Sequence, residues 1–159
     1  MIKKTIAIIG FIMLTGFATA KLVTVLPTNE NSLNKILNSD KIEITIINHG
    51  GYGASEIGRN KLILEKDKNT SDYIAKYDDK LNLKKSKFKI NQREMESLKG
   101  VFLDLISIHQ PNKKLNGDCV VIDKNFVLKS RGNSMIIQPM NNSMESYKFD
   151  NWISKSTID

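Results

Sequence analysis

The stretch Lys41-Ile-Glu-Ile-Thr-Ile-Ile-Asn48 decides the fold, because its isoleucines alternate with polar residues. Glu43 and Thr45 lie between isoleucines placed at every second position. Successive side chains of a β-strand point to opposite faces of a sheet, so this period predicts a half-buried strand. The chain is therefore expected to build a sheet that buries one face in a core.

Apolar patterns resume further along the chain. The segments Lys61-Leu-Ile-Leu-Glu65 and Tyr73-Ile-Ala-Lys-Tyr77 flank the turn Asp67-Lys-Asn-Thr70. Antiparallel strands are joined by short turns, whereas parallel strands need a long crossover connection. We expect three antiparallel strands before the first long helix.

The clearest helix lies between Asn91 and Pro111. Asn91 and Glu94 have the spacing of a capping box, in which two side chains satisfy free N–H groups at the helix start. Apolar residues then recur at alternating spacings of three and four, which places them on one helical face with His109 at its end. This stripe consists of Met95, Leu98, Phe102 and Leu105.

A second hairpin and a last helix follow. Phe126-Val-Leu-Lys129 and Met135-Ile-Ile-Gln138 are predicted strands around the turn Arg131-Gly-Asn-Ser134. The last helix is expected to start at a cap formed by Asn142, with Glu145 three residues later. Its buried face comprises Phe149, Trp152 and Ile153. The order strand-strand-strand-helix-strand-strand-helix predicts an α+β fold with a mainly antiparallel sheet in a single compact domain.

The N-terminus resembles an export signal in all three of its parts. Two lysines precede the uncharged run from Thr5 to Phe17, and the small residues Ala18-Thr-Ala20 follow it. This pattern is typical of a cleavable signal peptide over residues 1–20, with an uncleaved membrane anchor as the alternative. We expect residues 21–40 to form a leader with a short helix over Asn31–Asn38, and residues 41–155 to form the domain. The expected destination is the periplasm or the exterior of a bacterial cell. A lipoprotein would require a cysteine directly after the apolar run, and the single cysteine is Cys119.

Composition narrows the class of protein. The chain has 159 residues, of which 40% are hydrophobic and 26% charged, and a single cysteine. These values argue against a disordered chain, a collagen-like repeat or a disulfide-rich mini-protein. The net charge of +7 at pH 7 is mildly basic, and we expect a monomer that does not bind nucleic acid.

The glycine-rich segment His49-Gly50-Gly51-Tyr52-Gly53 follows the first strand directly. It lacks both the full GxGxxG spacing and a Lys-Ser/Thr ending, so nucleotide binding is not expected. Glycine permits close backbone approach, which predicts a loop that lies flat against a partner with Tyr52 as an anchor. The alternative is a tight or bulged hairpin connection without a binding role.

A strand leading into Gly50-Gly51-Tyr52-Gly53, followed later by a helix and a hairpin, resembles the small bacterial emfourin-type inhibitors of metalloproteases. The resemblance covers Ile42 to Gly53 and the order of elements. This sequence differs by its export signal and by an additional strand-rich stretch from Lys61 to Ile90. The resemblance implies inhibition of a protein partner and transfers no functional residue.

Lysines alternate with apolar residues in a further segment of the chain. The lysines are Lys80, Lys84, Lys85, Lys87 and Lys89, interleaved with Leu81, Leu83, Phe88 and Ile90. Together with the glycine-rich segment, Lys84, Lys85 and Lys87 form the predicted partner-binding site. A lysine face could meet an acidic protein or anionic lipid. The alternative is an edge strand that lysine protects from aggregation.

Catalytic and metal-binding patterns are weak. Cys119, His49, His109 and Asp118 include the residue types of nucleophilic catalysis, but their spacing matches no known arrangement. Cys119 opens the apolar run Cys119-Val-Val-Ile122 and is expected to be a buried strand residue. Two distant histidines and one cysteine do not form a metal-ligand cluster, so no cofactor is expected.

These observations favour an exported, non-catalytic protein that binds and inhibits or neutralises a macromolecular partner. Two alternatives remain open. One is a small periplasmic hydrolase that uses Cys119 or a serine. The other is a structural protein of the cell envelope.

Overall fold

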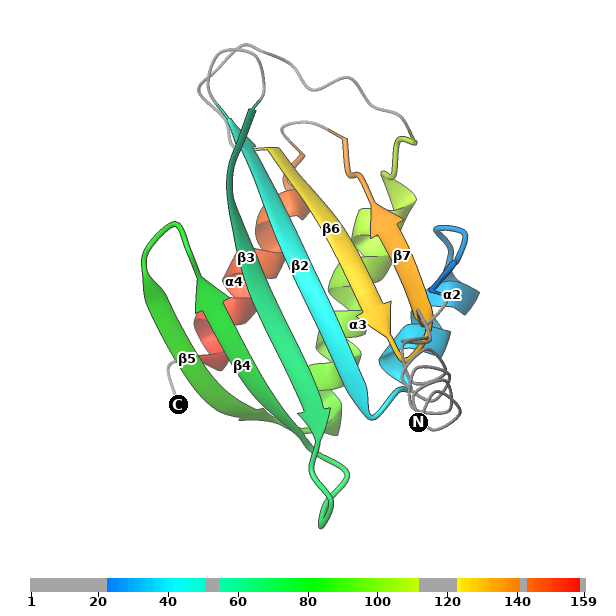
Figure 1. Cartoon of the computed structure of the whole chain (residues 1–159), viewed down its shortest axis with the longest axis vertical. Helices are drawn as coiled ribbons and strands as arrows, with labels where there is room; N and C mark the ends of the chain where they lie inside the picture. The colour runs from blue at the N-terminus through cyan, green and yellow to red at the C-terminus, as the bar shows by residue number, and fades with distance from the viewer. Residues whose placement is uncertain (1–22, 51–54, 112–122, 141–142, 158–159) are drawn as a thin grey trace, which may run out of the picture.

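The structure is a computed structural model that describes residues 23–50, 55–111, 123–140 and 143–157. These residues form one seven-stranded sheet and three helices (Figure 1). The strands are β1 (Thr24–Val25), β2 (Lys41–Gly50), β3 (Ser55–Lys66), β4 (Tyr73–Asp79), β5 (Lys84–Ile90), β6 (Asp123–Ser130) and β7 (Asn133–Ile137). The helices are α2 (Glu30–Leu37), α3 (Gln92–Ser107) and α4 (Glu145–Ser156).

The sheet has the order β1-β7-β6-β2-β3-β4-β5. Strands β2 to β5 form an antiparallel meander, and β6 returns to pair antiparallel with β2 on the opposite side from β3. Only β1, which pairs with β7, runs parallel to its neighbour among the described strands. The predicted α+β class with a mainly antiparallel sheet is therefore confirmed.

The predicted order of elements needs correction in two places. The structure adds β1 before the short helix that is predicted over Asn31–Asn38 and that forms as α2, and it places β5 as a fourth meander strand between β4 and α3. Strand β5 has few apolar residues, and it is held in place by seven residue pairs with β4, from Tyr73 opposite Ile90 to Asp79 opposite Lys84. Which strands pair in a sheet depends on contacts between distant parts of the chain, and a local hydrophobic pattern does not predict it.

The predicted capping box at the start of α3 is confirmed. The Asn91 side chain accepts from the Glu94 N–H at 3.0 Å, and the Glu94 carboxylate accepts from the Asn91 N–H at 2.7 Å. The apolar stripe of α3 is buried as expected. His109 lies beyond the helix, where its Nδ1 accepts from the Gln138 N–H at 2.9 Å, because α3 ends at Ser107.

Helix α4 begins later than predicted. Its first residue is Glu145 and its N-cap is Met144, which makes no side-chain capping hydrogen bond. The predicted cap, Asn142, lies outside the described residues. The hydroxyl groups of Ser143 and Ser146 lie 2.9 Å apart at this helix start. The apolar face of α4 is buried as predicted.

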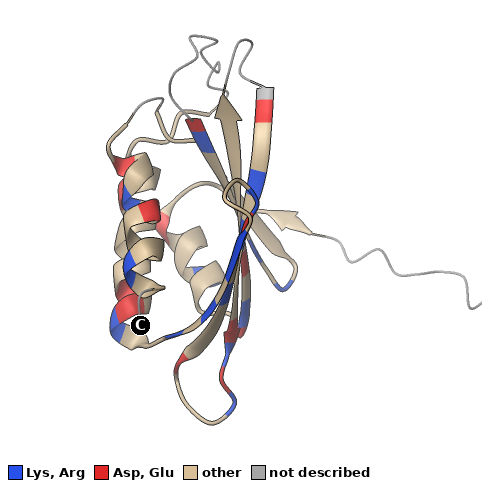
Figure 2. Ribbon diagram, turned by 90° about the vertical axis from the view of Figure 1, so that its left-hand side faces the viewer, with Lys and Arg blue, Asp and Glu red and all other residues tan. Residues whose placement is uncertain are grey.

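The three described helices cover one face of the sheet, and none of them covers the other, which we call the open face (Figure 2). Between the two layers lies the core, in which the rings of Phe102, Phe126 and Phe149 pack with centroids 5.5 to 5.9 Å apart. All three side chains are 0% exposed. Every second residue of the central strands faces this layer, including Ile42, Ile44, Ile46, Leu62, Leu64, Ala75 and Leu128.

The predicted signal peptide lies outside the described residues. Among the helices that the structure describes, none combines the length and apolar composition needed to cross a bilayer.

Candidate functional site

The predicted binding residues do not form one cluster. His49 and Gly50 end the central strand β2, whereas Lys84, Lys85 and Lys87 belong to β5 at the sheet edge. Two strands separate β2 from β5, which corresponds to about 14 Å across the sheet. Gly51, Tyr52 and Gly53 lie outside the described residues.

His49 projects from the open face of the sheet next to Asn125 of β6. The His49 Nε2 lies 3.2 Å from the Asn125 Nδ2. The Nδ1 of His49 and the Oδ1 of Asn125 are buried, and neither atom has a hydrogen-bond partner among the residues that the structure describes. The pair therefore forms a strand-to-strand contact on the same face as Lys85 and Lys87, whereas Lys84 lies on the helix-covered face.

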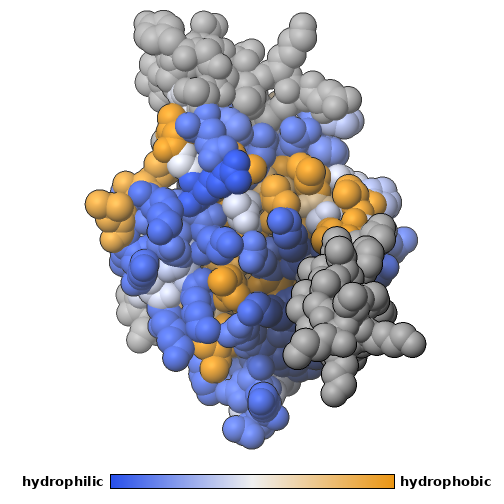
Figure 3. Space-filling view, in the orientation of Figure 1, coloured by the Kyte–Doolittle hydropathy of each residue, from blue (hydrophilic) through white to orange (hydrophobic). Residues whose placement is uncertain are grey.

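Two of the β5 lysines join a larger basic surface on the open face. We define the basic face as Lys61, Lys76, Lys85, Lys87 and the half-buried Ile63 between them. Adjacent strands bring these residues together, since Lys61 lies opposite Asp78, and Asp78 lies opposite Lys85. They line a groove of about 390 Å³. Figure 3 shows this side of the molecule, which is hydrophilic with smaller apolar areas.

Ion pairs neutralise part of the basic face. Lys61 contacts Glu43 at 3.1 Å, and Lys76 contacts Glu65 at 2.8 Å. Hydrogen bonds from Lys41 and Lys76 lower the pKa of Glu65 from 4.5 to about 2, so this carboxylate is ionised at neutral pH. Lys85 and Lys87 form no ion pair with any residue that the structure describes. These two ammonium groups are the free charges of the surface.

A second site lies on the helix-covered side of the sheet. At one end of the core, three adjacent strands replace apolar residues by polar ones, namely Lys124 on β6, Asn48 on β2 and Asn60 on β3. All three are buried, with 8%, 1% and 7% of their surface exposed. Lys124 is the register partner of Asn48. Here the core gives way to an open cleft of about 480 Å³, which we call the polar cleft.

Helix α4 and the turn after β4 form the other walls of the polar cleft. The helix contributes Tyr147, Asp150, Ile153 and Ser154, the end of β4 contributes Asp79, and the turn after it contributes Leu81 and Asn82. Leu81 can approach β3 because residue 58 is glycine. A Cβ on Gly58 would lie 2.9 Å from the Leu81 Cδ2.

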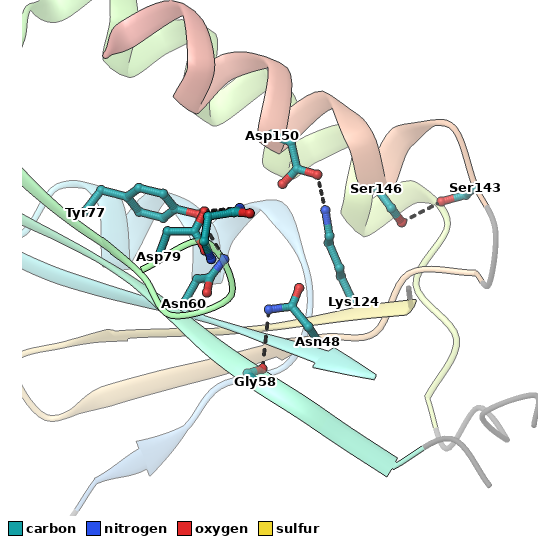
Figure 4. Close-up of polar contacts among 10 residues, drawn as sticks. Asn48, Gly58, Asn60, Tyr77, Asp79, Lys124, Ser143, Ser146 and Asp150 are labelled. Carbon is teal, nitrogen blue, oxygen red and sulfur yellow. Dashed lines mark hydrogen bonds and ion pairs between the residues drawn. The ribbon is translucent and has the colours of Figure 1, made fainter. Parts of the chain in front are cut away.

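Hydrogen bonds fix most of the cleft residues (Figure 4). Asn60 donates to the Tyr77 hydroxyl at 3.1 Å and accepts from the Lys80 N–H at 2.9 Å. Burial raises the pKa of Tyr77 to about 12, so the hydroxyl keeps its proton at neutral pH. Asp79 accepts from the backbone N–H groups of Leu81 and Asn82. This side of the cleft is a preorganised network.

Lys124 and Asp150 form an ion pair across the cleft. The Lys124 side chain is only 9% exposed, whereas that of Asp150 is 44% exposed. The Lys124 ammonium also lies 5.5 Å from the centroid of the Tyr147 ring. A buried ammonium group requires such compensation, because an isolated charge loses its hydration in the protein interior.

The sequence contains a pattern that could have located the polar cleft. Asn48 continues the period of Ile42, Ile44 and Ile46, and Asn60 lies two residues before Leu62. Lys124 likewise lies two residues before Phe126. A polar residue in phase with a buried apolar series marks the point where a core ends. The pairing of β6 with β2, which brings the three residues together, is not visible in the sequence.

Comparisons with protein-family models, with curated proteins and with solved structures find no match to this chain. The resemblance to emfourin-type inhibitors stays a prediction.

Proposed function

We propose that the protein is exported and that its basic face binds an acidic protein, which it inhibits or neutralises. The observation that supports this function best is the pair of unneutralised lysines, Lys85 and Lys87, on a sheet face that the described helices leave open. Complementary charge accelerates the encounter of two proteins and sets their orientation. The export of the chain is supported by the sequence of residues 1–20.

The groove on the basic face suits a protein segment that combines acidic and apolar side chains. Ile63 is half-buried in the groove, and the aliphatic stems of the surrounding lysines add apolar surface around it. Lys85 and Lys87 line the groove from the edge strand β5, where carboxylates of a partner could reach their ammonium groups. An interface with an apolar centre and a charged rim is typical of specific protein complexes.

Protection of the sheet edge explains only part of this surface. Strand β5 is an edge strand, and lysines on such a strand discourage pairing with other chains. Lys61 and Lys76, however, belong to the inner strands β3 and β4, where no edge needs protection. The basic face therefore extends beyond the strand that edge protection would require.

The alternative of a hydrolase depends on Cys119 or a serine. Cys119 lies outside the described residues. Within the described ranges, neither histidine is hydrogen-bonded to a serine hydroxyl, since His49 contacts Asn125 and His109 contacts Gln138. A structural protein of the envelope remains the other alternative.

A charge-reversed variant tests the proposed function. Wild-type protein, the double variant Lys85→Glu/Lys87→Glu and the control Lys68→Glu/Lys155→Glu are immobilised and exposed to a cell-envelope extract. The control changes the net charge equally at exposed lysines outside the basic face. We expect an acidic protein that wild type and control retain and that the Lys85/Lys87 variant loses. The purified partner should then lose its activity when the wild-type protein is added.

Two results would contradict the proposal. One is that all three proteins retain the same set of proteins from the extract, and the other is that nucleic acid is the species that depends on Lys85 and Lys87. Melting curves of the three proteins confirm that each variant is folded. Binding that weakens at high salt would support a charge-driven complex, because salt screens exposed charges.

A further inference from the structure

The polar cleft lies on the opposite side of the sheet from the basic face, so a role for it is independent of the proposed function. We propose that the polar cleft binds a neutral, hydroxyl-rich molecule of monosaccharide or disaccharide size. The residues that would recognise it are Asn48, Tyr77 and Tyr147.

The first step of the argument is hydrogen-bonding capacity that the fold does not use. Asn48 is 1% exposed, and its Nδ2 donates to the Gly58 carbonyl at 3.3 Å. Its Oδ1 accepts no hydrogen bond from any described residue and points toward α4 in Figure 4. This acceptor faces the cleft and is available to a ligand.

Tyr77 supplies a matching donor on another wall of the cleft. Its hydroxyl oxygen accepts from Asn60, while its proton has no acceptor among the described residues. A hydroxyl group of a ligand can both donate and accept. One hydroxyl-bearing molecule can therefore use the acceptor of Asn48 and the donor of Tyr77 together.

The charges of the cleft favour a neutral ligand. Lys124 is compensated by Asp150. Asp79 accepts hydrogen bonds from two backbone N–H groups and from the Asn82 amide, which stabilise its carboxylate. No lone cation is left among the described cleft residues to hold an anion. An anionic ligand would have to displace Asp150 from Lys124, whereas a neutral one leaves this ion pair in place.

The remaining walls are apolar and aromatic. Leu81 and Ile153 line the cleft, and the ring of Tyr147 stands at its rim with 46% of the residue exposed. A sugar ring presents C–H groups on its faces and hydroxyl groups at its edge, which match such walls. The cleft volume of about 480 Å³ falls in the range of small-molecule sites, roughly 300–1,000 Å³.

The test is a titration of the isotopically labelled protein with D-glucose, N-acetyl-D-glucosamine and maltose, followed by NMR. Glycine and inorganic phosphate are titrated as representatives of zwitterions and anions. We expect at least one sugar to cause saturable shifts of the backbone amides of residues 48, 77, 124 and 147–154. Glycine and phosphate should leave these amides unchanged.

Matched variants connect the response to the cleft. Asn48→Ala should weaken the affinity for the sugar about tenfold, the loss expected for one hydrogen bond between neutral groups. Asn125→Ala is the control, because Asn125 is also a buried asparagine but faces the open side of the sheet. It should bind the sugar like the wild type. Tyr147→Ala, at an exposed position, gives a second test if Asn48→Ala does not fold.

Three outcomes would overturn the proposal. The first is the absence of a saturable response to every sugar at tens of millimolar. The second is a response that both Asn48→Ala and Tyr147→Ala leave intact. The third is saturation by glycine or phosphate at the same amides, which would assign the cleft to a charged ligand.

Discussion

Two residues of one strand, Phe126 and Lys124, show how the helix-covered layer divides into two regions. They point the same way from β6 and are two positions apart, yet Phe126 lies in a cluster of aromatic rings and Lys124 lies in the polar cleft. At the aromatic end, the side chains are fully buried and pack against one another. At the polar end, the buried ammonium of Lys124 depends on Asp150 for its charge partner. The Asn48 amide there has a hydrogen-bond acceptor that no described residue uses. Stability is therefore expected to reside at one end of the layer and recognition at the other.

Removal of the aromatic ring of Phe126 should have the largest effect on stability. Phe126 is 0% exposed and packs against Phe102 and Phe149, so Phe126→Ala leaves a cavity that the neighbouring rings cannot fill. We expect a loss of about 3–5 kcal/mol in the free energy of unfolding, measured by urea denaturation. Phe126→Leu, which keeps most of the volume, should lose much less. A loss below about 1 kcal/mol in Phe126→Ala would place the stabilising contacts elsewhere.

The ion pair of the polar cleft should respond asymmetrically to substitution. Asp150→Ala leaves the nearly buried ammonium of Lys124 without its partner and should lower the free energy of unfolding by about 1–3 kcal/mol. Lys124→Met removes the buried charge together with its need for a partner, so its cost should be smaller. Urea denaturation of both variants gives the comparison. Equal losses, or a larger loss in Lys124→Met, would mean that the pair itself is strongly stabilising.

Asn48 gives the sharpest separation of stability from recognition. Asn48→Leu replaces a buried amide by leucine, the residue type at the core-facing positions 62 and 64 of the neighbouring strand β3. It also removes the 3.3 Å hydrogen bond to the Gly58 carbonyl. We expect the free energy of unfolding to change by no more than about 1 kcal/mol, while the affinity for the sugar falls by about tenfold or more. A large loss of stability with unchanged sugar binding would reverse the assignment of this end of the layer.

The two regions also differ in how far the sequence predicts them. Helix α3 was predictable because its capping box and its apolar stripe are local patterns, and both are confirmed. The alternating isoleucines of β2 likewise fix its buried face. The core therefore follows from short-range periodicity together with the rule that apolar faces are buried.

The polar cleft could not be predicted in the same way. Its residues come from β2, β3, β4, β6, α4 and a turn, and only the pairing of β6 with β2 brings Lys124 beside Asn48. The predicted site failed to form a cluster for the same reason, since the position of β5 at the edge separates Lys85 from His49. The alternation of lysines with Phe88 and Ile90 indicates a strand at β5, but it does not show which strand pairs with it, so the predicted order lacks β5.

Substitution of the exposed charges on the open face should have the smallest effect on the free energy of unfolding. The lysines among these charges are more exposed to solvent than Lys124, which pairs with Asp150. Glu65 accepts hydrogen bonds from Lys41 at 2.6 Å and from Lys76 at 2.8 Å, and these lower its pKa from 4.5 to about 2. A carboxyl group with a lowered pKa in the folded state stabilises the fold above pH 4.5, and this contribution is lost as the pH falls toward 2. The side chains of Lys41, Lys76 and Glu65 are all more than a third exposed, so solvent screens both ion pairs.

Glu65→Gln should therefore reduce the free energy of unfolding at pH 7 by only about 0.2–1 kcal/mol. The difference between wild type and variant should shrink between pH 4.5 and 2, where the wild-type carboxylate becomes protonated and loses its pairing with both lysines. Urea denaturation across this range, repeated at high salt, measures the effect, and salt should reduce it at pH 7 because exposed pairs are screened. A difference that persists at pH 2 would mean that the effect does not come from the charge of Glu65. A loss as large as that of Asp150→Ala would show that the open face contributes to stability as strongly as the half-buried pair, against the division between a stabilising layer and an exposed charged surface.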